Sequence, residues 1–502
     1  MPKPAAHRDH PEVSKALPAL GPALRRADAE TLERARALAR RAPNDARIHD
    51  LLSTALAMTA QREPAVAHAR RALTLKPDDA ALAARCVSVL QRAGAYDEAL
   101  AATERARYAN PDDRMLAGLR VTILTDLGRG PDAARALQAL RAEIGDAPTP
   151  QESARLALMD ARLAPTHTDA RAAADALAPI VEDQRTPPGF RRAGAFQLGR
   201  LHESMGEHEH AFAFYTLGNE TQKPDWDPDA HSTRIDACIR SVTDAWSDPG
   251  LFPKTTVDGS RLVFVLGMMR SGSSLLEQML AQLDAVTPAG EQSLILPQIA
   301  RIEAHRDRSI MPLPLHPERY DAARMDEIAR RAMERYERLA PEGLITDKQT
   351  ENALVAPLLS RLFPGCTIVL TTRDAMDCCV SNYVQSFAQD HPQSRDQRWI
   401  GRYRLDHERL MDAWRALPGF DMLEIDYADL VADPERETRR VADEIAVQWS
   451  ERVLRFHESD RAIATASREQ VREPIHARSV GRARRFAPWL APLRETLGLA
   501  EP

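Results

Sequence analysis

The chain has 502 residues, of which 44% are hydrophobic and 28% are charged. This length and balance predict a globular protein of about two to four domains. The net charge of −6 and the interleaving of basic with acidic residues exclude a general nucleic-acid binder. No run approaches the ~20 apolar residues that cross a bilayer, and the first residues lack the apolar core of a signal peptide. We therefore expect a cytoplasmic protein without a membrane span.

The cysteines indicate neither disulfides nor a metal site. The chain has five of them, and no two have CxxC spacing: Cys86, Cys238, Cys366, Cys378 and Cys379. An odd number without paired spacing predicts no disulfide framework and no zinc site. The adjacent pair at 378–379 is expected to pack within a helix.

A 34-residue period follows a first segment, 1–25, that we expect to be a flexible N-terminus. The recurring positions are Pro43, Pro77 and Pro111, then Ala65, Ala99 and Ala133, then Gly94 and Gly128. The small residues let paired helices approach closely, and each proline ends a helix. Asp78 and Asp112 are expected at the N-caps that follow. A 34-residue period is similar to that of tetratricopeptide repeats, so residues 26–245 are predicted to form an all-α solenoid.

Segment 190–218 resembles one more repeat, whereas the register of 145–189 is left open. A solenoid has a concave face that binds peptides or partners, or that packs on a neighbouring domain, and both uses stay open. Residues 246–260 are rich in Pro, Gly and Ser and are predicted to be a linker.

The periodicity changes after this linker. Short apolar runs predict buried parallel strands at 261–267, 366–373 and 421–427. Helical patterns follow at 273–283, 352–363, 375–388 and 434–445. Strands that alternate with helices predict an α/β domain over 261–502 with a central parallel sheet and helices on both faces.

The segment LVFVLGMMRSGSSLLEQML, residues 262–280, predicts a phosphate-binding loop. A strand leads through a small-residue loop into a helix N-terminus, where backbone N–H groups and the helix dipole favour an anion. The expected anion-binding residues are Arg270, Ser271, Gly272, Ser273 and Ser274. The loop lacks the GK[ST] ending of a kinase or GTPase, and Arg270 is a permanently charged fork instead. The alternative is a tight turn whose serines cap the helix.

A second candidate anion site begins at Arg373, which ends a predicted strand. Ligands of open α/β sheets bind at such carboxyl ends. Ser381 lies eight residues further on the following helix, about two turns away, and can face the same side. Together they could hold a phosphate monoester. The alternative is a surface pair between Arg373 and Asp374.

These two motifs in combination resemble the sulfotransferases that use PAPS (3'-phosphoadenosine 5'-phosphosulfate). The first resembles their 5'-phosphosulfate loop and the second their 3'-phosphate motif. The chain is most similar to bacterial tetratricopeptide-repeat sulfotransferases and, beyond them, to tyrosylprotein sulfotransferases. Further islands of resemblance are GEQSLILPQI (290–299), DYADLVADPERE (426–437), SREQVREPI (467–475) and VGR (480–482). The resemblance covers residues 261–495 and implies a P-loop-like sulfotransferase fold.

The resemblance also implies roles for the reacting centre. Glu291 is the expected base that takes a proton from the acceptor hydroxyl. Lys348 is expected at the bridging oxygen of the donor, and Arg270 at the sulfuryl group, where both stabilise developing charge. Relatives often read DKMPxN where this chain reads DKQTEN, and Met269 stands where relatives have Pro.

The nucleotide contacts implied by the resemblance are Arg373 and Ser381 at the 3'-phosphate, with Tyr427, Ser467 and Arg482 as further contacts. PAPS is the expected co-substrate and PAP the product, with no metal. The reaction would be one in-line displacement on an acceptor hydroxyl.

Several alternatives stay open. The acceptor is a peptide or protein tyrosine, held by the repeat face, or a small-molecule or saccharide hydroxyl. A nucleotide kinase is disfavoured by the missing GK[ST]. A repeat scaffold with an inactive transferase half is the alternative from another class. The oligomeric state is open, with a homodimer as one option.

Overall fold

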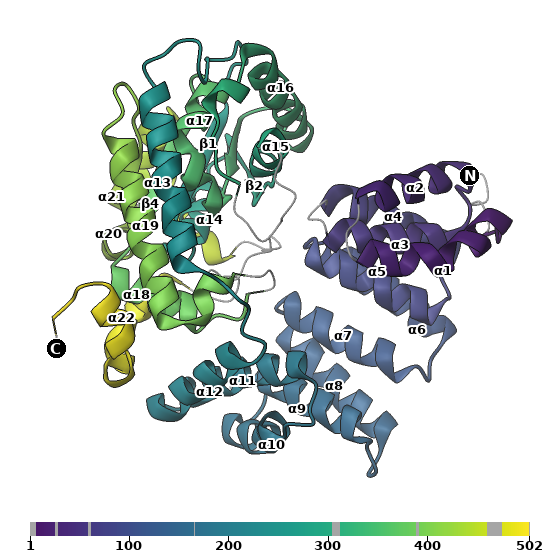
Figure 1. The fold of residues 1–502 in the computed structure, drawn as a ribbon. Coiled ribbons are helices and arrows are strands. Elements are labelled where there is room, and N and C mark those ends of the chain that lie inside the picture. Colours follow the sequence, from purple (N-terminus) through teal and green to yellow (C-terminus); the bar gives the residue numbers. More distant parts are fainter. Residues whose placement is uncertain are drawn as a thin grey trace. The chain divides into compact units, whose positions relative to one another are not determined.

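The computed structural model describes residues 7–25, 29–58, 62–164, 166–303, 312–387, 391–458 and 474–500. The chain contacts divide it into two units, one ending at Glu207 and one beginning at His208 (Figure 1).

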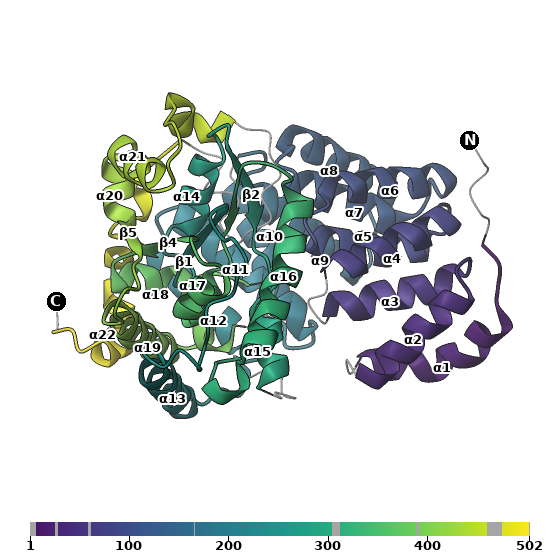
Figure 2. The ribbon, with the colours of Figure 1, turned by 90° about the horizontal axis from the view of Figure 1, so that it is seen from above.

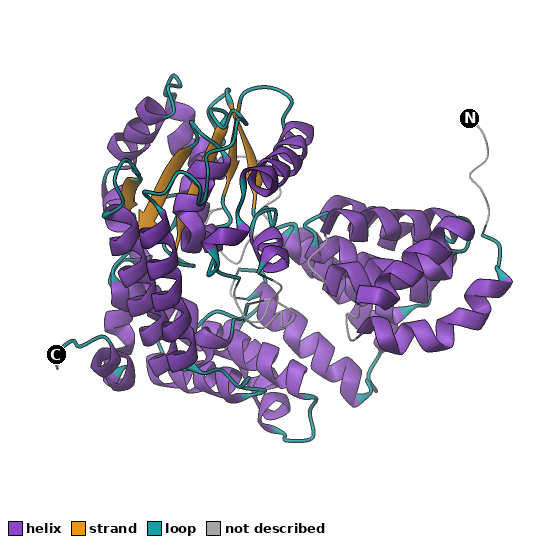
Figure 3. Cartoon of the chain, turned by 45° about the horizontal axis from the view of Figure 1, so that its top comes forward, coloured by secondary structure: helices purple, strands orange, loops and turns teal. Residues whose placement is uncertain are grey.

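The first unit is all helical (Figure 3). Its helices are α1 (Pro11–Arg25), α2 (Ala29–Arg41), α3 (Ala46–Met58), α4 (Arg62–Leu75), α5 (Ala80–Arg92), α6 (Tyr96–Ala109), α7 (Arg114–Asp126), α8 (Gly130–Ile144), α9 (Pro150–Leu163), α10 (Ala170–Glu182) and α11 (Pro188–Ser204). Consecutive helices pack on one another, α3 on α4, α5 on α6 and α7 on α8. The predicted helical N-terminal region is confirmed, and its assignment to the tetratricopeptide class stays a prediction.

The 34-residue period of the sequence reappears in the helix starts. Helices α3, α5 and α7 begin at Ala46, Ala80 and Arg114. The predicted N-caps were one residue early: Asp79 accepts from Leu82 N–H at 2.9 Å, and Asp113 caps α7 in the same way. The reason is geometric, since an N-cap carboxylate must reach the N–H group two or three residues ahead.

The prediction of a flexible segment over residues 1–25 was wrong for its second half. Residues 11–25 form α1, and Val13 and Leu20 are buried in the apolar core of the first repeats. An amphipathic helix that buries such side chains is held by tertiary packing.

The second unit alternates strands and helices. Its elements are α12 (His208–Glu220), α13 (Pro228–Ala245), β1 (Leu262–Gly267), α14 (Ser273–Leu280), β2 (Val286–Gly290), α15 (Leu296–Ile302), α16 (Ala322–Leu339), β3 (Leu344–Asp347), α17 (Ala356–Leu362), β4 (Thr367–Thr372), α18 (Ala375–Tyr383), α19 (Gln397–Arg415), β5 (Leu423–Asp426), α20 (Tyr427–Ala432), α21 (Pro434–Glu444) and α22 (Ala491–Thr496). Short 3₁₀ helices include η2 (Thr350–Val355) and η7 (Arg482–Trp489). No helix among the described residues is long and apolar enough to cross a membrane.

The sheet has five strands in the order β2-β3-β1-β4-β5, and every neighbouring pair is parallel (Figure 2). The parallel sheet is as predicted. Two of its strands, β2 and β3, were not predicted, because they are short and carry Pro288 and a flanking Gly343 that weaken a strand pattern.

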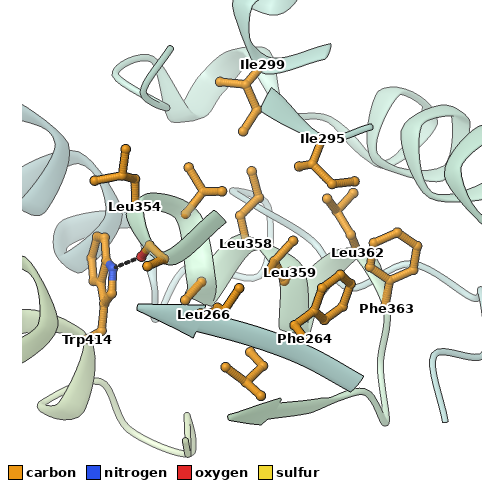
Figure 4. Close-up of a cluster of buried hydrophobic side chains, with 14 of the residues drawn as sticks. Phe264, Leu266, Ile295, Ile299, Leu354, Leu358, Leu359, Leu362, Phe363 and Trp414 are labelled. Carbon is orange, nitrogen blue, oxygen red and sulfur yellow. Dashed lines mark hydrogen bonds between the residues drawn. The ribbon is translucent and has the colours of Figure 1, made fainter. Parts of the chain in front are cut away.

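The core of this unit lies between β1 and the helices that cover it (Figure 4). Phe264 and Leu266 of β1 contribute to a buried cluster with Leu359 of α17 and Ile295. Trp414 of α19 is fully buried and donates its indole N–H to the Ala353 carbonyl at 3.1 Å. This packing holds the strand that leads into the predicted anion loop.

The predicted boundary at 245–261 differs from the contacts in the structure, which group α12 and α13 with the sheet. The predicted linker is also packed: Phe252 is buried, Thr255 N–H donates to the Arg361 carbonyl, and Gly259 N–H donates to the Pro364 carbonyl. The Pro and Gly content indicated a break in periodicity. A packed connection and a free linker both show such a break, so composition did not distinguish them.

Candidate active site

The predicted site residues gather at the carboxyl edge of the sheet. Each of the five strands is followed at once by one of them: Glu291 follows β2, Lys348 follows β3, the loop at 268–272 follows β1, Arg373 follows β4 and Tyr427 follows β5. Because all strands are parallel, their carboxyl ends meet at one edge. The strand order puts the loop in the middle, with Lys348 on one side and Arg373 on the other.

The loop after β1 has an unusual backbone. Gly267, Arg270 and Gly272 all have positive φ, at 141°, 69° and 108°. A Cβ on Gly272 would lie 2.6 Å from the Tyr427 ring, so only glycine fits there. The left-handed Arg270 carries backbone strain of about 1 kcal/mol or more, which the fold must offset. Part of that offset is visible, because the Arg270 carbonyl accepts from Arg373 at 2.9 Å.

The head of α14 offers backbone donors to a ligand. Gly272 occupies the N-cap and provides no side-chain cap, while Ser273 and Ser274 begin the helix and are buried. The first N–H groups of a helix have no partner within the helix and attract an anion. This arrangement disfavours the alternative in which the serines merely cap the helix. Ser271 instead anchors the loop, with its Oγ 2.6 Å from Thr371 Oγ1 of β4.

Arg270 and Ser381 meet, although they belong to different predicted motifs. Arg270 Nε donates to Ser381 Oγ at 3.0 Å. Arg373 contacts Arg270 and Tyr427. It donates to the Arg270 carbonyl, and its guanidinium lies 4.6 Å from the Tyr427 ring centroid. The alternative of a surface Arg373–Asp374 pair fails, because Arg373 is 7% exposed and Asp374 caps α18.

The arginine cluster is strongly positive, and of its members Arg373 is buried while Arg270 and Arg482 are half-buried. Burial, together with the charges of Arg373 and Arg482, lowers the pKa of Arg270 to about 10. Arg373 bonds two backbone carbonyls, and its buried Nε has no hydrogen-bond partner among the described residues. A buried, unmatched guanidinium N–H is costly unless a ligand completes it. An anion with several oxygens would meet this need.

Arg482 is held at the cluster by a carboxylate that the sequence analysis missed. Asp377 on α18 accepts from Gly481 N–H at 2.6 Å and from Ala483 N–H at 2.8 Å. It thereby fastens the backbone on both sides of Arg482. The available signal was the spacing RDxxD after β4, which places an acid one turn into the helix.

Glu291 and Lys348 form an ion pair at the other side of the loop. Lys348 Nζ donates to Glu291 Oε1 at 2.6 Å, and Lys348 N–H donates to the Gly290 carbonyl at 2.8 Å. The Lys348 side chain is 1% exposed and that of Glu291 is 33% exposed. Glu291 is therefore a paired carboxylate with an open face, which differs from a solvated loop residue.

Ser467 lies outside the described residues, so its predicted nucleotide contact stays a prediction. The other predicted residues all lie on the carboxyl edge or on α18 and η7 beside it. Together they place an arginine cluster and a carboxylate–ammonium pair at one edge of the sheet, an arrangement whose charges suit an anionic ester.

Comparison with known proteins places this domain in a family. A family model described as Sulfotransferase family matches residues 263–451. This part of the chain is therefore a sulfotransferase-family domain.

Individual relatives are distant. An uncharacterized protein of Aquifex aeolicus (strain VF5) is 29% identical over 334 residues, which are 63% of this chain and 43% of that protein. A Caenorhabditis briggsae protein named "Putative protein-tyrosine sulfotransferase" is 24% identical over 200 residues, or 39% of this chain and 70% of that one. The sulfotransferase domain of the Synechococcus PCC 7002 olefin synthase is similar at 18% identity and a TM-score of 0.30, covering 46% of this chain and 96% of that domain.

Proposed function

We propose that the second unit transfers a sulfuryl group from PAPS to an acceptor hydroxyl and releases PAP. One observation carries the proposal: a single sheet edge presents an arginine cluster on one side of a strained loop and a Lys348–Glu291 pair on the other, and within the cluster the buried Nε of Arg373 has no hydrogen-bond partner among the described residues. A donor with a phosphate at one end and a phosphosulfate at the other needs both.

The residues present fit a bisphosphate nucleotide. The Nε of Arg373, which has no partner among the described residues, and the hydroxyl of Ser381 suit a phosphate monoester, with the Tyr427 ring beside Arg373 and the charge of Arg482 acting on Arg270. The N-terminus of α14, where Gly272 at the N-cap has no capping side chain, suits a second phosphate that approaches the backbone closely. The missing GK[ST] lysine argues against a nucleoside triphosphate donor.

The proposed chemistry uses three residues. Glu291 takes the proton of the acceptor hydroxyl as its oxygen forms a bond to sulfur. The bond from sulfur to the 5'-phosphate oxygen breaks, and that oxygen keeps the electron pair. Lys348 and Arg270 stabilise the charge that develops, and such preorganised donors each contribute about 2.7–4 kcal/mol in other enzymes. No covalent enzyme intermediate is needed, so the buried cysteines have no proposed role.

The proposed acceptor is a tyrosine hydroxyl of a peptide or protein. The name of the Caenorhabditis briggsae relative supports this acceptor, as does the peptide-binding habit of helical repeats. The first unit is proposed to bind that peptide or a partner protein. A saccharide or small-molecule hydroxyl is the competing outcome.

The test is transfer of radiolabel from PAPS to panels of tyrosine peptides, saccharides and phenolic metabolites. We expect label on a tyrosine peptide with the wild-type protein and none with Glu291→Gln, while both bind PAP alike. Binding of PAP without transfer to any panel would favour the inactive scaffold. Tighter binding of ATP than of PAP would overturn the donor assignment.

A further inference from the structure

Two buried carboxylates hold the backbone on either side of Glu291. The N–H of Gly290, just before it, donates to Glu277 Oε1 at 2.9 Å. The N–H of Gln292, just after it, donates to Asp347 Oδ1 at 3.3 Å. Glu277 is 2% exposed and Asp347 is 1% exposed. The short segment that presents Glu291 is therefore fastened at both ends by acids from two other elements.

Asp347 also fastens the segment that presents Lys348. The same Oδ1 accepts from Gln349 N–H at 2.9 Å, and Oδ2 accepts from the Tyr336 hydroxyl of α16. Asp347 precedes Lys348 directly, and Gln349 follows it. One carboxylate thus ties together the two loops whose side chains form the Lys348–Glu291 pair.

Glu277 connects the same loop to the helix that receives the donor. It lies on α14, about one turn beyond the buried serines at the head of that helix. Its Oε1 accepts from Gly290 N–H and from the Thr346 hydroxyl of β3 at 3.3 Å. The position of Glu291 is therefore coupled to α14 and β3 together.

Simple structural needs do not explain this pair of acids. Burial, together with the nearby charge of Glu277, raises the pKa of the Asp347 carboxyl to about 7. Burying two acids beside each other costs folding free energy, whereas neutral side chains could accept the same N–H groups. Costly arrangements of this kind cluster at functional sites. Asp377 repeats the arrangement by accepting the two N–H groups that flank Arg482.

We propose that Asp347 and Glu277 are positioning residues, which set the placement of Glu291 and Lys348 for transfer while touching no substrate. The inference deepens the proposed function and rests on it. A misplacement of the reacting groups by about 1 Å can cost ~100-fold in rate. The carboxylates act through the loop backbone, so their loss should lower turnover and leave donor binding unchanged.

The kinetic test compares Asp347→Ala with Asp347→Asn. Asparagine keeps an oxygen that accepts from both N–H groups, whereas alanine leaves them unpaired. We expect Asp347→Ala to lower kcat by about 10- to 100-fold with KM for PAPS little changed, and Asp347→Asn to stay within about threefold of wild type. PAP-binding stoichiometry counts the folded protein in each sample. An alanine variant with full kcat would overturn the proposal, as would an equal loss in the asparagine variant.

A second readout needs no activity and so separates this inference from the proposed function. Acylation of lysine amines, followed by mass spectrometry, reports how well Lys348 is held. We expect Lys348 to react slowly in wild type and in Asp347→Asn, and at least tenfold faster in Asp347→Ala. Lys223, which pairs with Asp396 elsewhere in the unit, is the internal control and should not change. Unchanged Lys348 reactivity in Asp347→Ala would refute the positioning role, even if wild type transfers no sulfate.

Variants of Glu277 provide an independent test of the same kind. Glu277→Gln retains an acceptor oxygen for Gly290 N–H, and Glu277→Ala removes it. We expect rescue by glutamine and a loss of kcat with alanine, again at constant PAP affinity. Asp347→Ser, whose hydroxyl is too short to reach both N–H groups, replaces Asp347→Ala if the latter fails to fold.

Discussion

Arg270 Nε donates to Ser381 Oγ at 3.0 Å, which joins two residues that lie 111 positions apart in the chain. The resemblance assigned Arg270 to the sulfuryl group and Ser381 to the 3'-phosphate. Their contact means that the two predicted anion sites are directly adjacent. Arg270 must therefore leave Ser381, or serve both ends, when a donor binds.

This contact predicts unequal effects of two substitutions on PAP affinity. Arg270→Ala removes a half-buried cation next to Arg373 and Arg482, and charged hydrogen bonds contribute about 1.5–3 kcal/mol each. We expect PAP to bind about 10- to 100-fold more weakly to Arg270→Ala by calorimetry. Ser381→Ala removes one neutral hydroxyl and should cost less than about tenfold. Arg415→Ala, at an exposed pair with Glu424, is the control and should bind PAP normally. A larger loss for Ser381→Ala than for Arg270→Ala would contradict this ranking.

Gly272 is predicted to tolerate no side chain. Its φ of 108° strains any other residue, and an added Cβ would lie 2.6 Å from the Tyr427 ring. We expect Gly272→Ala to lower the free energy of unfolding by about 1–3 kcal/mol and to weaken PAP binding by displacing Tyr427.

Gly419→Ala is the matched control for the backbone strain alone. Gly419 also has a positive φ, at 68°, but nothing lies within 4 Å of its added Cβ. It should lose stability and keep full PAP affinity. Equal PAP affinity in Gly272→Ala and wild type would show that the loop does not touch the nucleotide.

Stability should fall as the pH rises towards 7, in part because of Asp347. Burial raises its pKa from 3.8 to about 7, so the folded state binds a proton that the unfolded state releases between these values. The stabilisation is complete below about pH 4 and is lost as the pH rises through 7, with a limit of about 4 kcal/mol. Asp347→Asn should flatten the profile over this window in urea titrations at pH 4 to 8. An unchanged slope would mean that Asp347 is already ionised in the folded protein.

The folding unit of the catalytic half is predicted to begin at residue 208. On α12, Phe212 stacks on Tyr383 at 5.6 Å between ring centroids, and Asn219 donates to the Tyr383 carbonyl. Tyr383 ends α18, the helix that carries Ser381. We expect a fragment of residues 208–502 to fold and bind PAP, and a fragment of 261–502 to expose this apolar face and aggregate. Circular dichroism and PAP titration of both fragments check this, and a folded, PAP-binding 261–502 would argue against it.

Within the catalytic half, local patterns predicted the elements that have strong periodicity. The runs at 262–267 and 367–372 are continuous and β-branched, so β1 and β4 were recognisable, as was the small-residue loop at 268–272 between a strand and a helix. Strands β2 and β3 were missed because five or four residues with Pro288 and a flanking Gly343 carry too weak a signal. Because these two strands were not predicted, the sequence did not show that their neighbouring carboxyl ends bring Glu291 close to Lys348.

The carboxylates that fasten the site were not predictable either. Glu277, Asp347 and Asp377 look like ordinary acids in the sequence, and each accepts from backbone N–H groups 13 to 106 positions away. Such contacts arise only when helices and strand ends from separate regions are packed together.

The amino-acid sequence by itself therefore determined the helical period of the first unit, the parallel α/β character of the second, and the strand ends at the loop of 268–272, Arg373 and Tyr427. These depend on patterns within single elements and on the 34-residue spacing, which can be recognised without knowing which elements contact one another. Tertiary structure alone decided that Arg270 lies on Ser381, that Lys348 pairs with Glu291, and where the second unit begins. Strand order and long-range burial set these distances, and no local pattern encodes them.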